Sequence, residues 1–254
     1  MQKTIFYLTA LTLILYLTLA AFLYFNQSNL LYHPTPKVEN NFEKIVFKDK
    51  SDTTVAYVLN PNQQKALIAF GGNNDSMANV AKIYKDKFKD YTIYLLDYRG
   101  YGLSSGKPSQ EAIFKDALKL YDFVSKKHKT IDTIGRSLGT AVAIYVASKR
   151  DVNKVVLVTP FDSILDIAKE RYWFLPVSLL VKDKYLSKNY AKDIKAKVLI
   201  LVAKNDKIVS LKRTQNLIKA LKDKDIKVVT LNHGHNDIVE DPKYYEIINS
   251  FLKD

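Results

Sequence analysis

The chain has 254 residues, of which 47% are hydrophobic and 26% charged, and this suits one sizeable folded domain or two small ones. It contains no cysteine, which excludes disulfides, thiolate zinc sites and cysteine nucleophiles. The net charge of +13 comes from lysines spread along the chain, a pattern that disfavours nucleic-acid binding and fits either a solvated surface or attraction to an anionic bilayer.

Residues 1–26 are predicted to form an N-terminal transmembrane signal anchor. Thr4 to Phe25 contains no charged residue, glycine or proline, and at ~1.5 Å per residue its helix would be about 33 Å long, enough to cross a bilayer core. Lys3 precedes this run and no charge follows it before Lys37, so we expect a cytoplasmic N-terminus and a domain on the extracytoplasmic side of the cell membrane. A signal peptide cleaved after residues 18–20 is the alternative, but the apolar run continues beyond that point.

Residues 27–43 are predicted to be a linker, whose two prolines suggest an extended segment docked against the domain. In residues 44–254, short β-type runs alternate with helical patterns, which predicts a single α/β domain. Several of the expected strands are continuous apolar runs, typical of a mostly parallel sheet buried by helices on both faces. The expected strands are Lys44–Lys48, Thr54–Leu59, Ala66–Phe70, Thr92–Leu96, Thr130–Ile134, Lys154–Val158, Lys197–Val202 and Ile226–Leu231. The expected helices are Ser76–Phe88, Gln110–Lys127, Leu138–Lys149, Leu211–Leu221 and Pro242–Leu252.

A glycine-rich loop follows the third of these strands and reads Gly71-Gly72-Asn73-Asn74-Asp75. Glycines let the backbone come close to a ligand, so we interpret the Asn73 N–H as a candidate donor to an oxyanion. The same residues are also typical of a plain turn.

Residues 133–139 read Thr-Ile-Gly-Arg-Ser-Leu-Gly and carry the strongest chemical signal in the chain. This G-x-S-x-G lies between an expected strand and an expected helix, the setting of a nucleophile elbow with Ser137 as the nucleophile. The turn is so tight that a side chain at either flanking glycine would clash with neighbouring backbone. The N–H of Leu138 then points to the place where an oxyanion would form. A chance glycine-rich turn is disfavoured because the chain has only 8 glycines.

A serine nucleophile needs a base, and the base needs an acid that orients it. Asp206 is the candidate acid, because it follows an apolar strand and the active-site crevices of parallel sheets lie at the carboxyl ends of strands. A surface turn is the alternative interpretation of this Asn-Asp sequence.

The candidate base is one of four histidines. His33 lies in the linker, and His128 stands among lysines at a helix end, where we expect it to be solvated. His233 and His235 both follow the last strand, and the glycine before His235 permits an exposed loop conformation. The residues alone leave both open, with His235 favoured.

In chain order these residues resemble the sites of the serine α/β-hydrolases. Four further segments resemble that family's D-Y-R-G-Y-G-x-S-x-G, S-P-F-x-S, G-H-N-D and L-Y-x-P-x-P motifs. These segments are Asp97–Gly106, Thr159–Ser163, Gly234–Asp237 and Leu31–Pro36. From about residue 28 to the C-terminus the chain is similar to the single-pass, membrane-anchored branch of α/β-hydrolase domain proteins. The resemblance implies the α/β-hydrolase fold, with a mostly parallel central sheet flanked by helices and a short cap.

The resemblance also implies a role for each residue. Ser137 attacks an acyl carbon, His235 transfers the proton, Asp206 orients the imidazole, and the N–H groups of Asn73 and Leu138 hold the oxyanion. It requires no metal and no organic cofactor. The family's oxyanion loop usually reads H-G-N-A, so this chain keeps the backbone donor but lacks the histidine.

Residues 161–196 are too few for a large lid and are predicted to form the short cap. Four of its residues are expected to line a substrate pocket, although ordinary packing is the alternative. They are Tyr172, Trp173, Phe174 and Leu175.

The sequence therefore predicts a membrane-anchored serine hydrolase of carboxylic esters or thioesters. Small-molecule, lipid or acylated-protein esters are the expected substrates, and nucleic acid is not expected as a partner. A serine peptidase of the same fold is one alternative, although no dedicated amine-binding pair is visible. A non-catalytic membrane-bound scaffold is the other, and the presence of all three triad residues argues against it.

Overall fold

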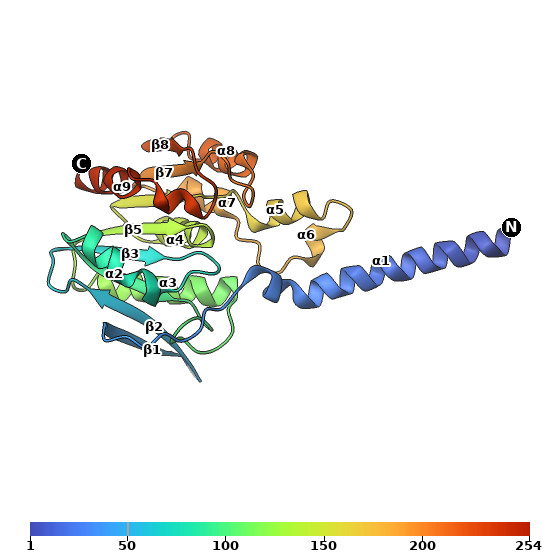
Figure 1. Cartoon of the computed structure of the whole chain (residues 1–254), viewed down its shortest axis with the longest axis horizontal. Helices are drawn as coiled ribbons and strands as arrows, with labels where there is room; N and C mark the ends of the chain where they lie inside the picture. The colour runs from blue at the N-terminus through green and yellow to red at the C-terminus, as the bar shows by residue number, and fades with distance from the viewer. Residues whose placement is uncertain (50) are drawn as a thin grey trace.

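The computed structural model describes residues 1–49 and 51–254. Within these ranges the domain is built on one eight-stranded sheet in the order β1-β2-β4-β3-β5-β6-β7-β8 (Figure 1). The strands are β1 Glu43–Asp49, β2 Asp52–Leu59, β3 Lys65–Phe70, β4 Tyr91–Asp97, β5 Thr130–Arg136, β6 Lys154–Val158, β7 Lys197–Ala203 and β8 Ile226–Leu231. β2 pairs antiparallel with β1 and β4, and the remaining neighbours pair in parallel. The prediction of a mostly parallel sheet is confirmed, and every predicted strand is present with ends that differ by at most two residues.

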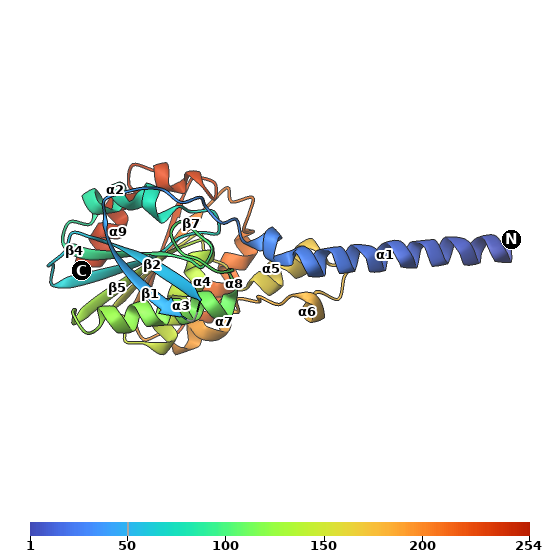
Figure 2. The same cartoon turned by 90° about the horizontal axis from the view of Figure 1, so that it is seen from below.

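Helices cover both faces of the sheet, as the continuous apolar strands predicted. Figure 2 shows α2 and α9 on one side of the sheet and α3, α4 and α7 on the other. Alternate residues of β7 enter opposite cores, with Ile200 on the α3 and α4 side and Leu199 on the α2 and α9 side. The five predicted helices are α2 Met77–Lys87, α3 Gln110–Val124, α4 Leu138–Lys149, α8 Leu211–Ala220 and α9 Tyr244–Lys253, and a short 3-10 helix spans Asp237–Glu240 before the last of them.

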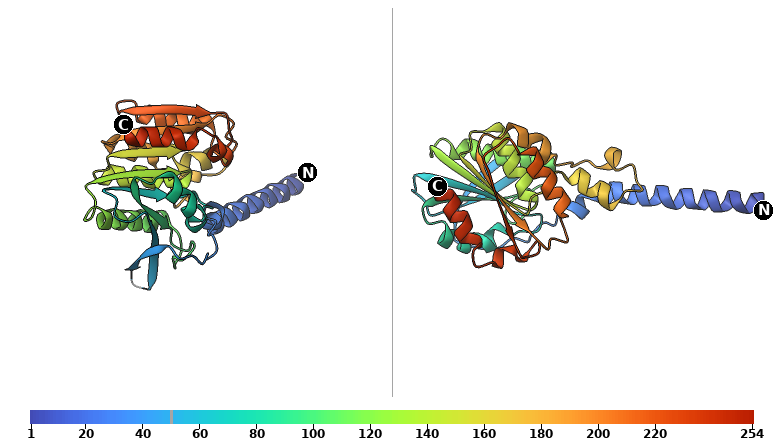
Figure 3. Two further views of the ribbon diagram at one scale, coloured as in Figure 1. Left: turned by 60° about the vertical axis from the view of Figure 1, so that its left-hand side comes forward. Right: turned by 90° about the horizontal axis from the view of Figure 1, so that it is seen from above.

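The N-terminal helix α1, Gln2–Leu31, extends away from the domain (Figures 1 and 3). None of its residues is buried, and it is long and apolar enough to cross a membrane. The helix continues past the predicted boundary at residue 26 to Leu31, and the Tyr32 N–H closes its last turn on the Ser28 carbonyl at 2.8 Å. Beyond Leu31 the chain runs without regular secondary structure to β1.

The predicted cap region contains four short helices, and two of them, α5 and α6, project beside α1 (Figures 1 and 3). These helices are α5 Ile164–Arg171, α6 Val177–Leu180, α7 Ser187–Tyr190 and the 3-10 helix Ala191–Asp193. Because the segment that precedes α5 leaves the carboxyl end of β6, the cap lies at the edge of the sheet where the candidate site residues also emerge.

Asp97 closes the loop that follows β4. Its buried carboxylate accepts hydrogen bonds from the Tyr57 hydroxyl at 2.9 Å and the Leu103 N–H at 3.1 Å. Gly102 has φ +51°, and a Cβ there would lie 2.2 Å from Asp97 Oδ2, so only glycine lets the loop wrap the carboxylate this closely. Burial raises the pKa of Asp97 to about 6, although the bonds from Leu103 and Tyr57 oppose the shift.

This pKa predicts a pH-dependent contribution to stability. Because the folded carboxyl binds its proton more tightly than the unfolded one, its contribution is fully present below about pH 4 and is lost as the pH rises through about 6. The unfolding free energy of wild type relative to Asp97→Asn should therefore fall by about 3 kcal/mol between those limits. Denaturant unfolding of the detergent-solubilised proteins across this range measures it, with the exposed Asp86→Asn as the matched control. A wild-type-to-variant difference that does not change with pH would contradict the prediction.

Candidate active site

The ends of four strands, β3, β5, β7 and β8, bring the candidate residues together at one edge of the sheet. Asn73 follows β3, Ser137 follows β5, Asp206 follows β7 and His235 follows β8. In a parallel sheet these carboxyl ends share an edge, and crevices at that edge are the usual place for ligands. A cavity of about 650 Å³ opens there, and Asn73, Ser137, Leu138 and His235 are among the residues that line it.

Ser137 occupies a strained turn between β5 and α4. Its φ of 51° and ψ of −117° are unfavourable for a residue with a side chain. A Cβ on Gly135 would lie 2.3 Å from the Gly139 carbonyl oxygen, and one on Gly139 would lie 2.1 Å from the Phe70 carbonyl oxygen. Neither position tolerates a side chain, so the two glycines allow the tight turn that presents the serine hydroxyl to the cavity.

The imidazole of His235 lies between Ser137 and Asp206. Nε2 is 2.8 Å from Ser137 Oγ, and Nδ1 is 2.6 Å from Asp206 Oδ2. Asp206 Oδ1 also accepts the N–H groups of Ile208 and Val209, each at 2.8 Å, so the carboxylate acts as an acceptor throughout. We therefore assign the Nδ1 proton to the bond with Asp206, which leaves the Nε2 lone pair for the serine O–H.

The remaining loop histidine is used elsewhere. His233 Nδ1 lies 3.2 Å from Asp237 Oδ2, and its Nε2 lies 3.2 Å from Asp241 Oδ2, so both ring nitrogens are occupied by carboxylates. The expectation of a solvated His128 is wrong, because this residue is buried and its Nε2 lies 2.9 Å from the Tyr94 hydroxyl. Helix α3 ends at Val124, before the predicted Lys127, and the chain then turns the imidazole inward.

Two backbone N–H groups are available as oxyanion donors beside Ser137. Leu138 is the first residue of α4, and the first N–H groups of a helix have no partner within it. The Asn73 N–H makes no hydrogen bond within residues 1–49 and 51–254. A Cβ built on Gly72 would lie 3.4 Å from the Ser137 Cβ, so this loop runs directly past the candidate nucleophile.

The loop that contains Asn73 is held by the end of α1 and by the segment that follows it. Asn73 donates from its side chain to the Leu31 carbonyl at 2.8 Å, and its own carbonyl accepts the His33 N–H at 3.0 Å. The Tyr101 hydroxyl donates to the same carbonyl at 2.7 Å. These bonds hold Asn73 by its side chain and its carbonyl, and so restrict the residue whose N–H is the candidate donor. His33, assigned to the linker from the sequence, lines the cavity as well.

A second set of polar residues was not singled out from the sequence. Asp75 accepts the Gly72 N–H at 2.6 Å and pairs with Arg136 at 2.5 Å, and Arg136 also donates to the Asn236 side chain at 3.0 Å. Burial lowers the pKa of Arg136, but Asp75 outweighs this and the net shift is upward. The three loops around Ser137 are thereby linked. The position of Asp75, three residues after the Gly-Gly pair, was the only sequence signal for this set. Its partner Arg136 lies about sixty residues further along the chain, so the sequence alone did not connect the two.

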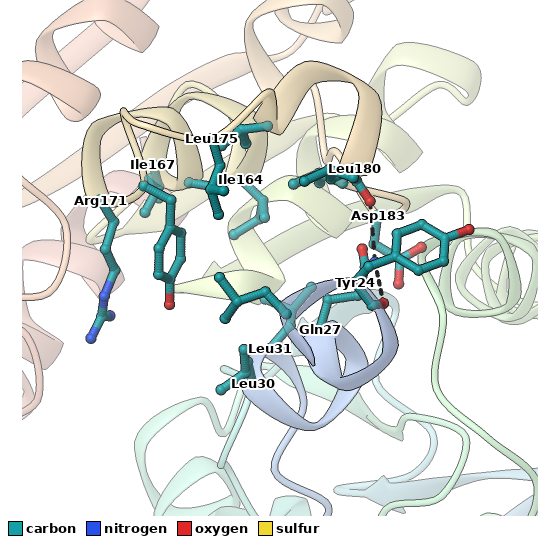
Figure 4. Close-up of a pocket in the computed structure, with 15 residues that line it drawn as sticks. Tyr24, Gln27, Leu30, Leu31, Ile164, Ile167, Arg171, Leu175, Leu180 and Asp183 are labelled. Atoms are coloured by element: carbon teal, nitrogen blue, oxygen red, sulfur yellow. Dashed lines mark hydrogen bonds between the residues drawn. The ribbon is translucent and has the colours of Figure 1, made fainter. Parts of the chain in front are cut away.

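The four expected substrate-pocket residues divide into two pairs. Tyr172 and Leu175 line a second cavity of about 190 Å³ between the cap and α1 (Figure 4). Trp173 and Phe174 line neither cavity and are 81% and 43% exposed. No cluster of three or more acidic or histidine side chains that could hold a metal ion occurs among the described residues.

Comparisons with known proteins identify relatives of this chain. A family model described as the alpha/beta hydrolase fold matches residues 65–176. A protein of Acanthamoeba polyphaga mimivirus described as an alpha/beta hydrolase is 30% identical over 219 residues, which cover 80% of this chain and 81% of that protein. A lysophosphatidylserine lipase of Danio rerio is 28% identical over 193 residues, covering 64% of this chain and 50% of the lipase.

An uncharacterized protein of Mycobacterium tuberculosis is 33% identical over 150 residues, which cover 58% of this chain and 53% of that protein. The chain thus spans about half the length of the mycobacterial protein and of the lipase. The solved structure of a Pyrococcus furiosus esterase has a TM-score of 0.66 at 20% identity and covers 87% of this chain and 98% of its own. At that identity the likeness concerns the fold alone.

We predict that Asp75 positions the loop beside Ser137. Asp75→Asn removes the ion pair with Arg136 while keeping a side chain of similar size, so the rate at which a fluorophosphonate labels Ser137 should fall on the order of tenfold to a hundredfold. Gel-based labelling kinetics of the solubilised protein provide the measurement. Asp90→Asn is the matched control, because that carboxylate is exposed and lies 3.7 Å from Lys253. Equal labelling rates for the Asp75 variant and wild type would rule out this role.

Proposed function

Because the chain belongs to the α/β-hydrolase family, we propose that it is a membrane-anchored serine hydrolase of carboxylic esters or thioesters. The observation that carries the proposal is the hydrogen-bonded series Ser137–His235–Asp206 at a strained strand–helix turn. The side chains of His235 and Asp206 are only 5% and 4% exposed, so water competes little for these bonds.

The proposed reaction proceeds through an acyl-enzyme. Ser137 Oγ attacks the acyl carbon as its proton passes to His235 Nε2, and the tetrahedral intermediate then expels the alcohol or thiol, which takes that proton. Water next attacks the acyl-enzyme, again through His235, and releases the carboxylic acid and free Ser137. Asp206 holds the imidazole in the required tautomer and stabilises its charged form.

The oxyanion of each intermediate would lie between the N–H groups of Asn73 and Leu138. Donors aimed at a developing charge in a site of low polarity lower the barrier most. The bonds that Asn73 already makes to Leu31 and His33 support this role, because they fix the donor before substrate arrives.

In the proposed organisation, α1 anchors the protein in the cell membrane and residues 44–254 form the catalytic domain outside the cytoplasm. The apolar character of α1 and the single charged residue, Lys3, on its first flank support this orientation. Ester substrates, either lipids, acylated proteins or small molecules, agree with the name of the Danio rerio lipase.

A fluorophosphonate probe combined with a panel of p-nitrophenyl esters and acyl thioesters tests the proposal. Wild type should be labelled and should hydrolyse at least one ester, and Ser137→Ala should lose labelling and at least about a thousandfold in kcat/KM. Ser148→Ala is the matched control, because Ser148 lies on α4 and its hydroxyl donates to the Tyr145 carbonyl; this variant should behave as wild type.

Absence of both labelling and turnover in folded wild type would refute the hydrolase and favour the scaffold interpretation. Cleavage of peptide amides without turnover of any ester would instead favour the peptidase.

A further inference from the structure

The second cavity lies between the anchor helix and the cap. Its walls are mainly apolar side chains that face one another across the gap (Figure 4). Leu23, Leu30 and Leu31 contribute from α1, and Ile164, Ile167 and Leu175 from the cap. The cavity is therefore formed jointly by the membrane helix and the domain.

This cavity adjoins the one that contains Ser137, because the two share lining residues. Leu30 and Leu31 of α1 and Ile164 and Ile167 of α5 line both. Arg171 also lines both, so the shared wall is apolar apart from one charged side chain, and the gap between α1 and the cap lies next to the cavity of the candidate nucleophile.

Two polar side chains in the cavity wall, Gln27 and Asp183, are already paired within the protein, and Arg171, at the end of α5, lies with its Cζ 6.0 Å from the Tyr172 ring centroid. Gln27 donates to the Leu180 carbonyl at 3.1 Å and accepts the Lys182 N–H at 2.8 Å. Asp183 accepts hydrogen bonds from the Tyr32 hydroxyl at 2.8 Å and the Gln110 N–H at 3.2 Å. An apolar occupant would leave these bonds intact, so the cavity suits a hydrocarbon chain.

The length of α1 places part of the cap inside a bilayer. A hydrocarbon core of about 30 Å needs about 20 helical residues, so a span that begins at Thr4 ends near Leu23. Tyr16, however, donates to the Phe174 carbonyl at 3.1 Å, and it lies about 10 Å below Leu23 along the helix. The tip of the cap would therefore enter the hydrocarbon region.

Side chains at the cap tip fit that depth. Trp173 and Leu179 are 81% and 84% exposed, an unfavourable state in water but not in lipid. Lys182 Nζ lies 4.3 Å from the Tyr24 ring centroid, close to the expected membrane boundary, where lysine and tyrosine are both common.

We propose that the cavity between α1 and the cap binds the acyl chain of a substrate that resides in the bilayer, and that the chain enters along α1. The substrate class is a long-chain acyl ester or thioester, and the last turns of the anchor helix form one wall of its specificity pocket. This inference rests on the proposed serine hydrolase function.

The test fills the cavity from each wall in the full-length protein. Ala168→Phe adds bulk from α5, and Leu23→Trp adds it from α1. For each variant, the kcat/KM for p-nitrophenyl decanoate relative to that for the butanoate should fall at least about tenfold, or about 1.4 kcal/mol. Lys169→Phe and Ala21→Trp introduce the same aromatic side chains at exposed positions that line neither cavity, and should keep the wild-type ratio.

The outcomes separate the two proposals. A reduced ratio in both filled variants but in neither control supports the acyl-chain pocket. If butanoate hydrolysis depends on Ser137 but the ratio is unchanged in both filled variants, the pocket assignment is overturned and the hydrolase stands. If wild type hydrolyses neither ester and resists the fluorophosphonate, the hydrolase itself fails, and this inference fails with it.

Discussion

The close approach of α4 to β3 and β5 is the constraint on which the rest of the site depends. Gly135 and Gly139 lie where a single added carbon would meet backbone atoms at 2.3 Å and 2.1 Å. The approach forces Ser137 into a left-handed conformation, and the surrounding sheet maintains it, since the Ser137 N–H donates to the Val158 carbonyl at 2.9 Å. One packing contact therefore aims the hydroxyl at the cavity and places the first N–H groups of α4 beside it.

The site also depends on bonds between loops, because its residues come from separate strands. Arg136 precedes Ser137 in the chain and joins Asp75 on one side to Asn236 on the other. Asn236 immediately follows His235, so a displacement of the loop that contains Asp75, Arg136 or Asn236 would also shift the other two loops. A guanidinium suits this position, because its fixed planar donors can hold two acceptors in defined directions at once.

Local patterns predicted the strands and the candidate site residues that the structure brings together, because apolar runs and glycines report directly on sheet burial and tight turns. The continuous apolar run of β7 marks a strand covered on both faces. The position of Asp206 just after this strand follows from the local sequence and does not depend on contacts with distant residues. His128 was misjudged because its burial depends on Tyr94, a residue on a strand more than thirty positions away. The outward direction of Trp173 depends likewise on how the cap meets α1, a tertiary contact that no local spacing reveals.

If α1 crosses the bilayer and the cavity binds an acyl chain as proposed, the joint construction of the cavity by α1 and the cap would give this helix a thermodynamic role beyond tethering. Moving an acyl chain from a bilayer through water costs about 0.8 kcal/mol for each methylene exposed. A pocket that opens at the depth of Leu23 lets the chain pass between two apolar environments and avoids most of that cost. Because Asn73 also bonds the Leu31 carbonyl, the same helix end helps fix the oxyanion loop. Replacing α1 by an unrelated membrane anchor would therefore alter chain selection and the geometry beside Ser137 together, even with every residue of the catalytic domain unchanged.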